Sequence, residues 1–166
     1  MFIRKLLFHF RTIIVLAWYR VLYLGRLNVG GGLSVRKGWG LMIADDAHCT
    51  IGHRCFFNNN CSIDVLDSVS IGDDCLFAEG VKIYDSNHVF NRAGVPIREQ
   101  GSTALGIEIG NNCWLGSNVV VLRGAKIGSN CVIGANCVIS DSIPDNSLVR
   151  FQPQMTVEPI KYKKCR

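Results

Sequence analysis

The chain has 166 residues, of which 48% are hydrophobic and 19% charged, and its formal net charge is +5. This composition excludes a disordered or collagen-like chain, and the length is sufficient for one domain with a buried core. The charge is unevenly divided, because residues 1–26 carry +5 and residues 150–166 carry +4, which leaves −4 on the part between. A mildly acidic body argues against nucleic-acid binding, which requires basic residues gathered on one face.

Residues 1–27 form a basic, apolar N-terminal segment that includes the stretch IIVLAWYRVLYL. We predict a helix of roughly 20 residues here, followed by a body over residues 28–149 and a basic tail over residues 150–166. The longest stretch without a charge, residues 12–19, is too short to cross a bilayer, and no small-residue cleavage site follows it. The helix is therefore expected either to pack on the body or to lie in a membrane interface, and the sequence leaves both open.

A six-residue repeat dominates the body. Residues 109–144 divide without a slip into the hexads IGNNCW, LGSNVV, VLRGAK, IGSNCV, IGANCV and ISDSIP, each beginning with an aliphatic residue. A repeat this short predicts a parallel β-helix, in which each hexad makes a strand and a corner, and three hexads close one triangular coil. We therefore predict an all-β fold with about five coils over residues 28–149. Residues 28–42 are too rich in glycine to be aligned with the hexad pattern.

The hexads follow a three-fold phase that assigns each strand to one of three faces. Hexads begin on face one at Ile51, Ile71, Ile109 and Ile127, on face two at Phe57, Phe77, Leu115 and Ile133, and on face three at Ile63, Ile83, Val121 and Ile139. Both insertions fall on face three, with two extra residues after Ile63 and twenty after Ile83. Insertions confined to one face indicate the working face of a solenoid, so the loop at residues 84–106 is expected to carry the active site.

Cysteines recur at the fifth place of the hexads. These are Cys55, Cys61, Cys75, Cys113, Cys131 and Cys137, and Cys49 is expected to match them. The fifth place points inward where coils stack tightly, and a free cysteine behaves there as a small hydrophobic residue. We therefore interpret these cysteines as structural rather than as a disulfide or metal framework, and reduced thiols fit the cytoplasm.

The segment IEIGNNCWLGSNVVVLRGAKIGSNCVIGANCVIS, preceded by YDSNHVF, resembles the hexapeptide-repeat O-acetyltransferases. This group includes the maltose and galactoside acetyltransferases and many polysaccharide-modifying enzymes. The resemblance covers residues 43–149. It implies a left-handed β-helix, a homotrimer whose active sites are shared between two chains, and acetyl-CoA as the acetyl donor, with no metal.

The resemblance also implies which residues form the acceptor side of the site. His88 lies in a segment similar to the family's catalytic histidine segment, and an imidazole suits the general base that acetyl transfer to a hydroxyl requires. Asn58 matches the family's acceptor-binding asparagine. Asp85, three residues before His88, is expected to orient the imidazole or bind sugar hydroxyls, or else to be a solvated loop acid.

On the donor side, four positions match those that surround acetyl-CoA in the family. Trp114 is expected to line the thioester end of the pantetheine groove, and the backbone N–H of Ser117 is expected to face the thioester carbonyl. Ala135 and Ser140 match small residues that flank the pantetheine between coils. The stretch RFQPQ at residues 150–154 departs from the family's Gly-x-Pro-Ala turn near the nucleotide end of CoA.

These features predict an enzyme that moves an acetyl group from acetyl-CoA to a saccharide hydroxyl in surface polysaccharide biosynthesis. It would act in the cytoplasm or on the inner face of the membrane, with residues 1–24 as a peripheral membrane contact. One alternative is N-acetylation of an amino nucleotide-sugar. Others are a zinc-dependent hydratase that uses His48, His53 and His88, and an inactive β-helix scaffold.

Overall fold

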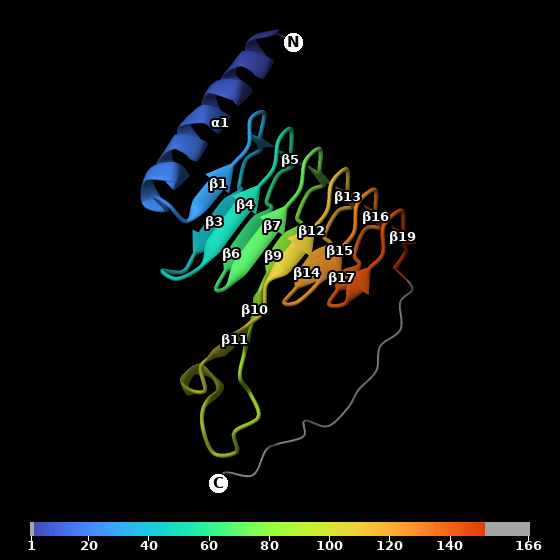
Figure 1. Cartoon of the computed structure of the whole chain (residues 1–166). Coiled ribbons are helices and arrows are strands. Elements are labelled where there is room, and N and C mark those ends of the chain that lie inside the picture. The colour runs from blue at the N-terminus through green and yellow to red at the C-terminus, as the bar shows by residue number, and fades with distance from the viewer. Residues whose placement is uncertain (1, 152–166) are drawn as a thin grey trace.

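The computed structural model describes residues 2–151, with side chains from residue 10 onward. Helix α1 (Phe2–Leu22) lies across one end of a stack of coils, and an arm extends from the side of the stack (Figure 1). The predicted N-terminal helix and all-β body are therefore confirmed. Most of the predicted basic tail, residues 152–166, lies outside the described residues.

Three parallel sheets form the faces of the stack. The first contains β1 (Leu27–Val29), β4 (His48–Ile51), β7 (Ser68–Ile71), β12 (Ile107–Ile109), β15 (Lys126–Ile127) and β18 (Ser142–Ile143). The second contains β2 (Ser34–Val35), β5 (Phe56–Phe57), β8 (Leu76–Phe77), β13 (Trp114–Leu115), β16 (Val132–Ile133) and β19 (Leu148–Val149). The third contains β3 (Gly40–Ile43), β6 (Ser62–Val65), β9 (Lys82–Tyr84), β14 (Val120–Leu122) and β17 (Val138–Ile139).

Strand register confirms the three-fold phase of the repeat. Residues assigned to the same face lie directly opposite one another in successive coils, as in the pairs Ile51–Ile71, Ile71–Ile109, Phe57–Phe77, Phe77–Leu115, Ile63–Ile83 and Ile83–Val121. All of these side chains are buried and form the continuous core of the stack.

The coil count differs from the expected five. Five coils place a strand in all three sheets, and a sixth, incomplete coil adds β18 and β19. The glycine-rich stretch that did not fit the hexad pattern forms the first coil, with strands β1, β2 and β3. Glycine is required there by close stacking: a Cβ on Gly30 would lie 2.7 Å from the backbone N of His53 in the next coil.

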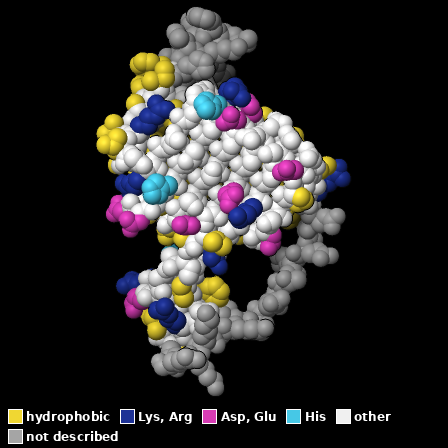
Figure 2. Space-filling model, in the orientation of Figure 1, with side chains coloured by type: hydrophobic (Ala, Val, Ile, Leu, Met, Phe, Trp, Pro, Cys, Tyr) yellow, Lys and Arg dark blue, Asp and Glu magenta, His cyan; other side chains and the backbone are white. Residues whose placement is uncertain are grey.

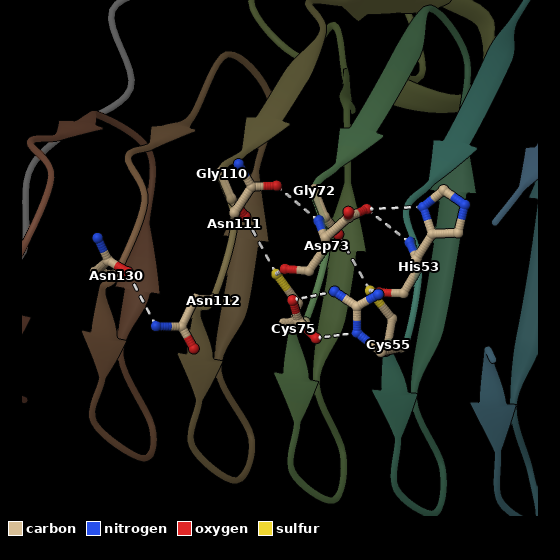
Figure 3. A network of polar contacts seen from close by, with 11 residues as sticks. His53, Cys55, Gly72, Asp73, Cys75, Gly110, Asn111, Asn112 and Asn130 are labelled. Carbon is tan, nitrogen blue, oxygen red and sulfur yellow. Dashed lines mark hydrogen bonds and ion pairs between the residues drawn. The ribbon is translucent and has the colours of Figure 1, made fainter. Parts of the chain in front are cut away.

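The cysteines are buried and free, as the fifth-place interpretation predicts. The structure adds a role for their thiols, because several donate to a backbone carbonyl in the next coil. Figure 3 shows two of these bonds, from Cys55 Sγ to the Gly72 oxygen and from Cys75 Sγ to the Gly110 oxygen, both 3.1 Å long. Cys113 repeats the pattern one coil later, 3.0 Å from the Gly128 oxygen. A cysteine therefore fills the space of a small residue and also satisfies a buried acceptor.

Asparagines recur at the fourth place of the hexads, where the corners need a left-handed backbone. Positive φ angles occur at Asn60, Asn112, Asn118, Asn130, Asn136 and Asn146. Asparagine tolerates this conformation better than most residues. Its amide then bonds to the next coil, as Asn112 Nδ2 does to Asn130 Oδ1 at 2.9 Å (Figure 3).

One face of α1 packs on the first coil. Val15, Leu16, Tyr19 and Tyr23 contact the core, and the Tyr19 ring meets Trp39 edge-on at 5.2 Å. The Tyr23 hydroxyl donates to the Leu41 carbonyl, 3.1 Å away. The packing alternative for the N-terminal helix therefore holds for this face.

We expect the seven described cysteines to resist thiol reagents in the folded protein. All seven are buried, which keeps them out of contact with a reagent. For Cys49, burial, with a smaller contribution from the Asp85 charge, also raises the pKa to about 12, and the thiolate is the reactive form. In a Cys165→Ser variant, which removes the cysteine outside the described residues, Ellman's reagent at pH 8 should react only after guanidinium unfolds the chain.

The same pKa shift gives a pH dependence of stability. The unfolded chain ionises Cys49 near its ordinary pKa of 9.0, whereas the folded protein keeps it protonated, so stability is lost as pH rises from 9.0 toward about 12.

For the reagent experiment, rapid reaction of the folded Cys165→Ser variant at pH 8 would contradict the burial of the thiols.

Candidate active site

His88 ends β10 (Ser86–His88), the first strand of the arm, which pairs antiparallel with β11 (Ser102–Ala104). Its side chain borders a cavity of about 400 Å³ at the edge of the third sheet. The cavity is lined by Met42, Asp64, Leu66, Tyr84, Ser86, Asn87, His88, Ser102 and Leu122. His88 Nδ1 lies 3.4 Å from Ser102 Oγ, directly across the hairpin. A hydroxyl at Nδ1 fixes the ring and leaves Nε2 for proton transfer.

The arm corresponds to the long insertion predicted at residues 84–106. Its tip contains a 3₁₀ turn, η1 (Ile97–Glu99), and is held by the buried side chain of Gln100. Gln100 Oε1 accepts the Arg92 N–H at 2.8 Å, and Gln100 Nε2 donates to the Val95 oxygen at 2.7 Å. Apolar side chains are nevertheless exposed along the arm, at Phe90, Val95, Ile97 and Leu105. The arm is thus an ordered projection with an apolar surface.

Asp85 has a role that the sequence analysis did not anticipate. Its carboxylate is fully buried, and its two oxygens accept the backbone N–H groups of Leu66 and Asp67, each at 2.7 Å. The Asp85 carbonyl also accepts the Leu105 N–H at 2.9 Å. Asp85 is therefore not a solvated loop acid, because both oxygens are enclosed, and the contact expected with sugar hydroxyls or the imidazole stays a prediction. Asp85 instead ties the two insertions of face three together beneath His88.

Asp64 is a cavity residue that sequence reasoning missed. It is half-buried on β6, and burial raises the pKa of its carboxyl, with Lys82 opposing this effect and the Asp85 charge adding to it. Nearby, the Tyr84 hydroxyl lies 3.3 Å from Ser62 Oγ. The signal for Asp64 was available, since it is an acid on the outward side of a strand that leads into the face-three insertion.

The predicted acceptor and donor residues do not gather around His88 in one chain. Asn58, Ser117 and Ala135 lie at the corner that joins the second sheet to the third, and Trp114 is exposed on the second sheet beside them. Asn58 Oδ1 accepts a bond from Arg36 Nη1 at 3.3 Å. This corner and the His88 corner are at opposite ends of the third sheet.

The length of the third sheet sets the separation between the two corners. Strand β6 has four residues and spans about 13 Å at 3.3 Å per residue. Ser140 follows β17 at the same corner as His88, so it too is separated from Ala135 and Ser117. In one chain the predicted site residues therefore form two candidate half-sites, one with His88 and Ser140 and one with Asn58, Trp114, Ser117 and Ala135.

The histidines required for a zinc site are dispersed. His53 lies at a first-sheet corner, where its Nδ1 is 3.2 Å from Asp73 Oδ1 and its backbone N–H donates to the same oxygen at 2.7 Å (Figure 3). His48 begins β4, and His88 is in the arm. Across residues 10–151, no group of three or more His, Cys, Asp or Glu side chains is placed to hold a metal ion.

Two family models match the chain. The bacterial transferase hexapeptide (six repeats) matches residues 106–141, and the hexapeptide repeat of succinyl-transferase matches residues 49–84. Nodulation protein L of Rhizobium meliloti is 33% identical over 144 residues, which cover 82% of this chain and 72% of that protein. The chain belongs to the hexapeptide-repeat acetyltransferase family.

Two further matches carry names that state an acetyltransferase activity. WbbJ of Escherichia coli, whose name assigns it to lipopolysaccharide biosynthesis as an O-acetyl transferase, is 31% identical over 65% of this chain and 62% of its own length. A galactoside acetyltransferase in complex with coenzyme A superimposes with a TM-score of 0.65 and 30% identity, over 78% of this chain and 63% of that one. The chain spans between 38% and 72% of the lengths of the curated relatives it matches.

The buried carboxylate predicts a specific effect of Asp85→Asn. The variant places an amide N–H₂ against a backbone N–H donor and should cost about 1.5–3 kcal/mol, the usual value for a hydrogen bond to a charged group. We expect faster hydrogen exchange at the Leu66 and Asp67 amides and a lower Tm.

The matched control is Asp67→Asn, because that carboxylate is exposed. Equal exchange rates in the wild type and Asp85→Asn would show that the carboxylate does not hold the two insertions together.

Proposed function

We propose that the protein is an acetyl-CoA-dependent O-acetyltransferase that acts on a saccharide hydroxyl, with His88 as the general base. The observation that carries the proposal is the placement of His88 beside a cavity, with Nδ1 toward Ser102 and Nε2 available. The galactoside and lipopolysaccharide acetyltransferases among its relatives support a saccharide acceptor.

In the proposed reaction, the acceptor hydroxyl gives its proton to His88 Nε2 as its oxygen bonds to the thioester carbonyl carbon. The C–S bond then breaks, and the CoA thiolate takes the proton from the imidazolium. This direct transfer needs no covalent enzyme intermediate, because the thioester is already activated.

The oxyanion that forms on the thioester carbonyl needs a donor, and we assign it to the Ser117 N–H. Within residues 2–151 this N–H has no hydrogen-bond acceptor, whereas the neighbouring N–H groups of Gly116 and Asn118 donate to the Ile133 and Glu79 carbonyls. Ser117 is exposed at its corner, on the edge of a cavity of about 430 Å³. A preorganised backbone donor of this kind stabilises the transition state.

The two half-sites support a homotrimer in which each active site lies between two copies. His88 from one copy would face Asn58, Trp114, Ser117 and Ala135 of the next, and a threefold axis closes this head-to-tail contact into a ring. The exposed apolar arm supports the same assembly, since a neighbouring copy would cover it.

The acceptor is proposed to occupy the cavity beside His88. Asp64 and Tyr84 offer a carboxylate and a hydroxyl there, and Met42, Leu66 and Leu122 offer apolar surface for a sugar ring. We infer a polymeric or lipid-linked saccharide of surface polysaccharide biosynthesis, handled in the cytoplasm. Asn58 of the next copy would hold the acceptor hydroxyl against the base.

Binding of the donor predicts a shift in thermal stability. CoA at about 100 times its Kd should add roughly 2.7 kcal/mol to the stability of the folded protein, which a thermal melt detects directly. Ala135→Leu should reduce the shift by filling the pantetheine groove, and Thr50→Leu, on the exposed side of β4, should not. No shift with millimolar CoA or acetyl-CoA would remove the donor assignment.

The shared site predicts that two inactive variants restore each other. His88→Ala should lower kcat by about 10²–10⁴-fold, the usual contribution of a general base, without weakening CoA binding. If Asn58→Ala is inactive as well, trimers refolded from an equal mixture should regain about a quarter of the sites, because only one pairing of copies in four is intact.

The measurement is CoA thiol release from acetyl-CoA in the presence of a panel of saccharides and amino sugars. Each variant refolded alone is the control. A mixture no more active than either variant would place the whole site in one chain.

A further inference from the structure

The second face of α1 has no partner among residues 10–151. Its apolar side chains are between 48% and 84% exposed and belong to Phe10, Ile13, Ile14, Trp18, Val21, Leu22 and, just beyond the helix, Leu24. The helical members recur at intervals of three and four residues, which gathers them on one side of a helix. Thr12, Val15, Leu16, Tyr19 and Tyr23 occupy the opposite side, against the first coil. Figure 2 shows hydrophobic side chains along this edge of the molecule.

The charge around this face is of one sign. Residues 1–26 contain five Arg or Lys residues and no Asp or Glu. Arg11 and Arg20 are exposed, and at 100° per residue they fall on the two borders of the apolar face. Arg20 Nη2 donates to the Val29 oxygen at 3.2 Å, so its guanidinium lies close to the first coil. The Arg11 side chain can extend toward a charged surface while its stem covers apolar area.

We propose that this face of α1, here called the docking face, binds the surface of a bilayer that contains anionic lipids. An apolar stripe with Trp and Phe, bordered by arginines, is the pattern of a helix that lies in the headgroup region. Among the described residues, no helix is long and apolar enough to cross a membrane. A second copy of the docking face fits less well, because it would bring arginines toward arginines without an acid to pair them.

This mode of docking also orients the rest of the molecule. Because α1 covers the first coil, the coils extend away from the bilayer, and His88 follows a strand of the third coil. Two coil steps of about 4.8 Å separate the first coil from the third. Ser117 and Ala135 belong to the fourth and fifth coils, farther from the surface. The proposal rests on the helix alone and stands whether or not the protein transfers acetyl groups.

The test uses the full chain and sedimentation with vesicles of phosphatidylcholine, with or without about one third phosphatidylglycerol. We expect binding that is stronger on the anionic vesicles and weakened by salt. The double variant Trp18→Glu/Val21→Glu should bind at least about tenfold less, because it removes apolar area and adds like charge. Leu148→Glu, an exposed apolar position on the last coil, is the matched control and should bind normally.

Two further measurements separate the docking face from other sources of binding. In a Trp114→Phe background, brominated lipids should quench the emission of Trp18, whereas buried Trp39 should not respond. A variant with Lys161, Lys163 and Lys164 changed to Gln should still bind, which excludes the basic C-terminal segment as the anchor.

Vesicle binding that survives Trp18→Glu/Val21→Glu, or that leaves Trp18 unquenched, would overturn the proposal. So would a wild type that ignores vesicles but loses a self-associated state in the double variant, since the occupant would then be a second copy. Circular dichroism of the double variant should match the wild type, because both substituted side chains are exposed.

Discussion

The whole structure depends on the spacing of stacked parallel strands, about 4.8 Å, which each coil must keep at its corners as well as along its sheets. At the corners that carry glycine on the second place of a hexad, this distance leaves no room for a side chain, as the 2.6 Å approach of a Gly116 Cβ to the Ala135 nitrogen shows. The same spacing puts the Cys75 thiol within 3.1 Å of the Gly110 carbonyl one coil away. The same inter-strand distance in every coil therefore explains why the same residue types recur every six residues.

That spacing also creates a problem at the end of the stack, where a strand edge would leave carbonyl groups without donors. The N-terminal segment supplies the donors. Thr12 Oγ1 reaches the Val35 oxygen at 3.4 Å, and Arg20 Nη2 reaches the Val29 oxygen at 3.2 Å. Arg26 Nη1 donates to the Ala44 oxygen at 2.8 Å. Polar side chains of one helix and its linker thus close all three faces of the first coil, which leaves the far side of the helix for another use.

The proposed general base lies where the chain departs from the repeat. Both insertions found in the sequence follow third-sheet strands, and Asp85 joins them by accepting two backbone N–H groups. His88 lies three residues after Asp85, at one edge of the third sheet. Ser117 lies in a regular corner at the other edge. A rigid coil cannot bend to bring these edges together, so a site that uses both needs more than one copy of the chain.

The repeat was sufficient to predict the regular part of the protein: the β-helix, the three-fold phase, the buried cysteines and the position of the arm. A periodic pattern is sufficient for these features because residues at the same place of each hexad have the same surroundings. Ile83, for example, is buried for the same reason as Ile63. The glycine-rich first coil could not be divided into hexads from the sequence. Its glycines are required by close contact with Gly52 and His53 in the next coil, rather than by a place in the hexad.

The surroundings of the irregular residues became known from the three-dimensional structure. It enclosed Asp85 against Leu66 and Asp67, placed Asp64 in the cavity beside His88, and set the predicted site residues at two separate corners. It also divided the N-terminal helix into a packed face and an exposed one. These outcomes depend on which groups from distant parts of the chain come within a few ångströms of one another, and a local pattern of residues does not contain that information.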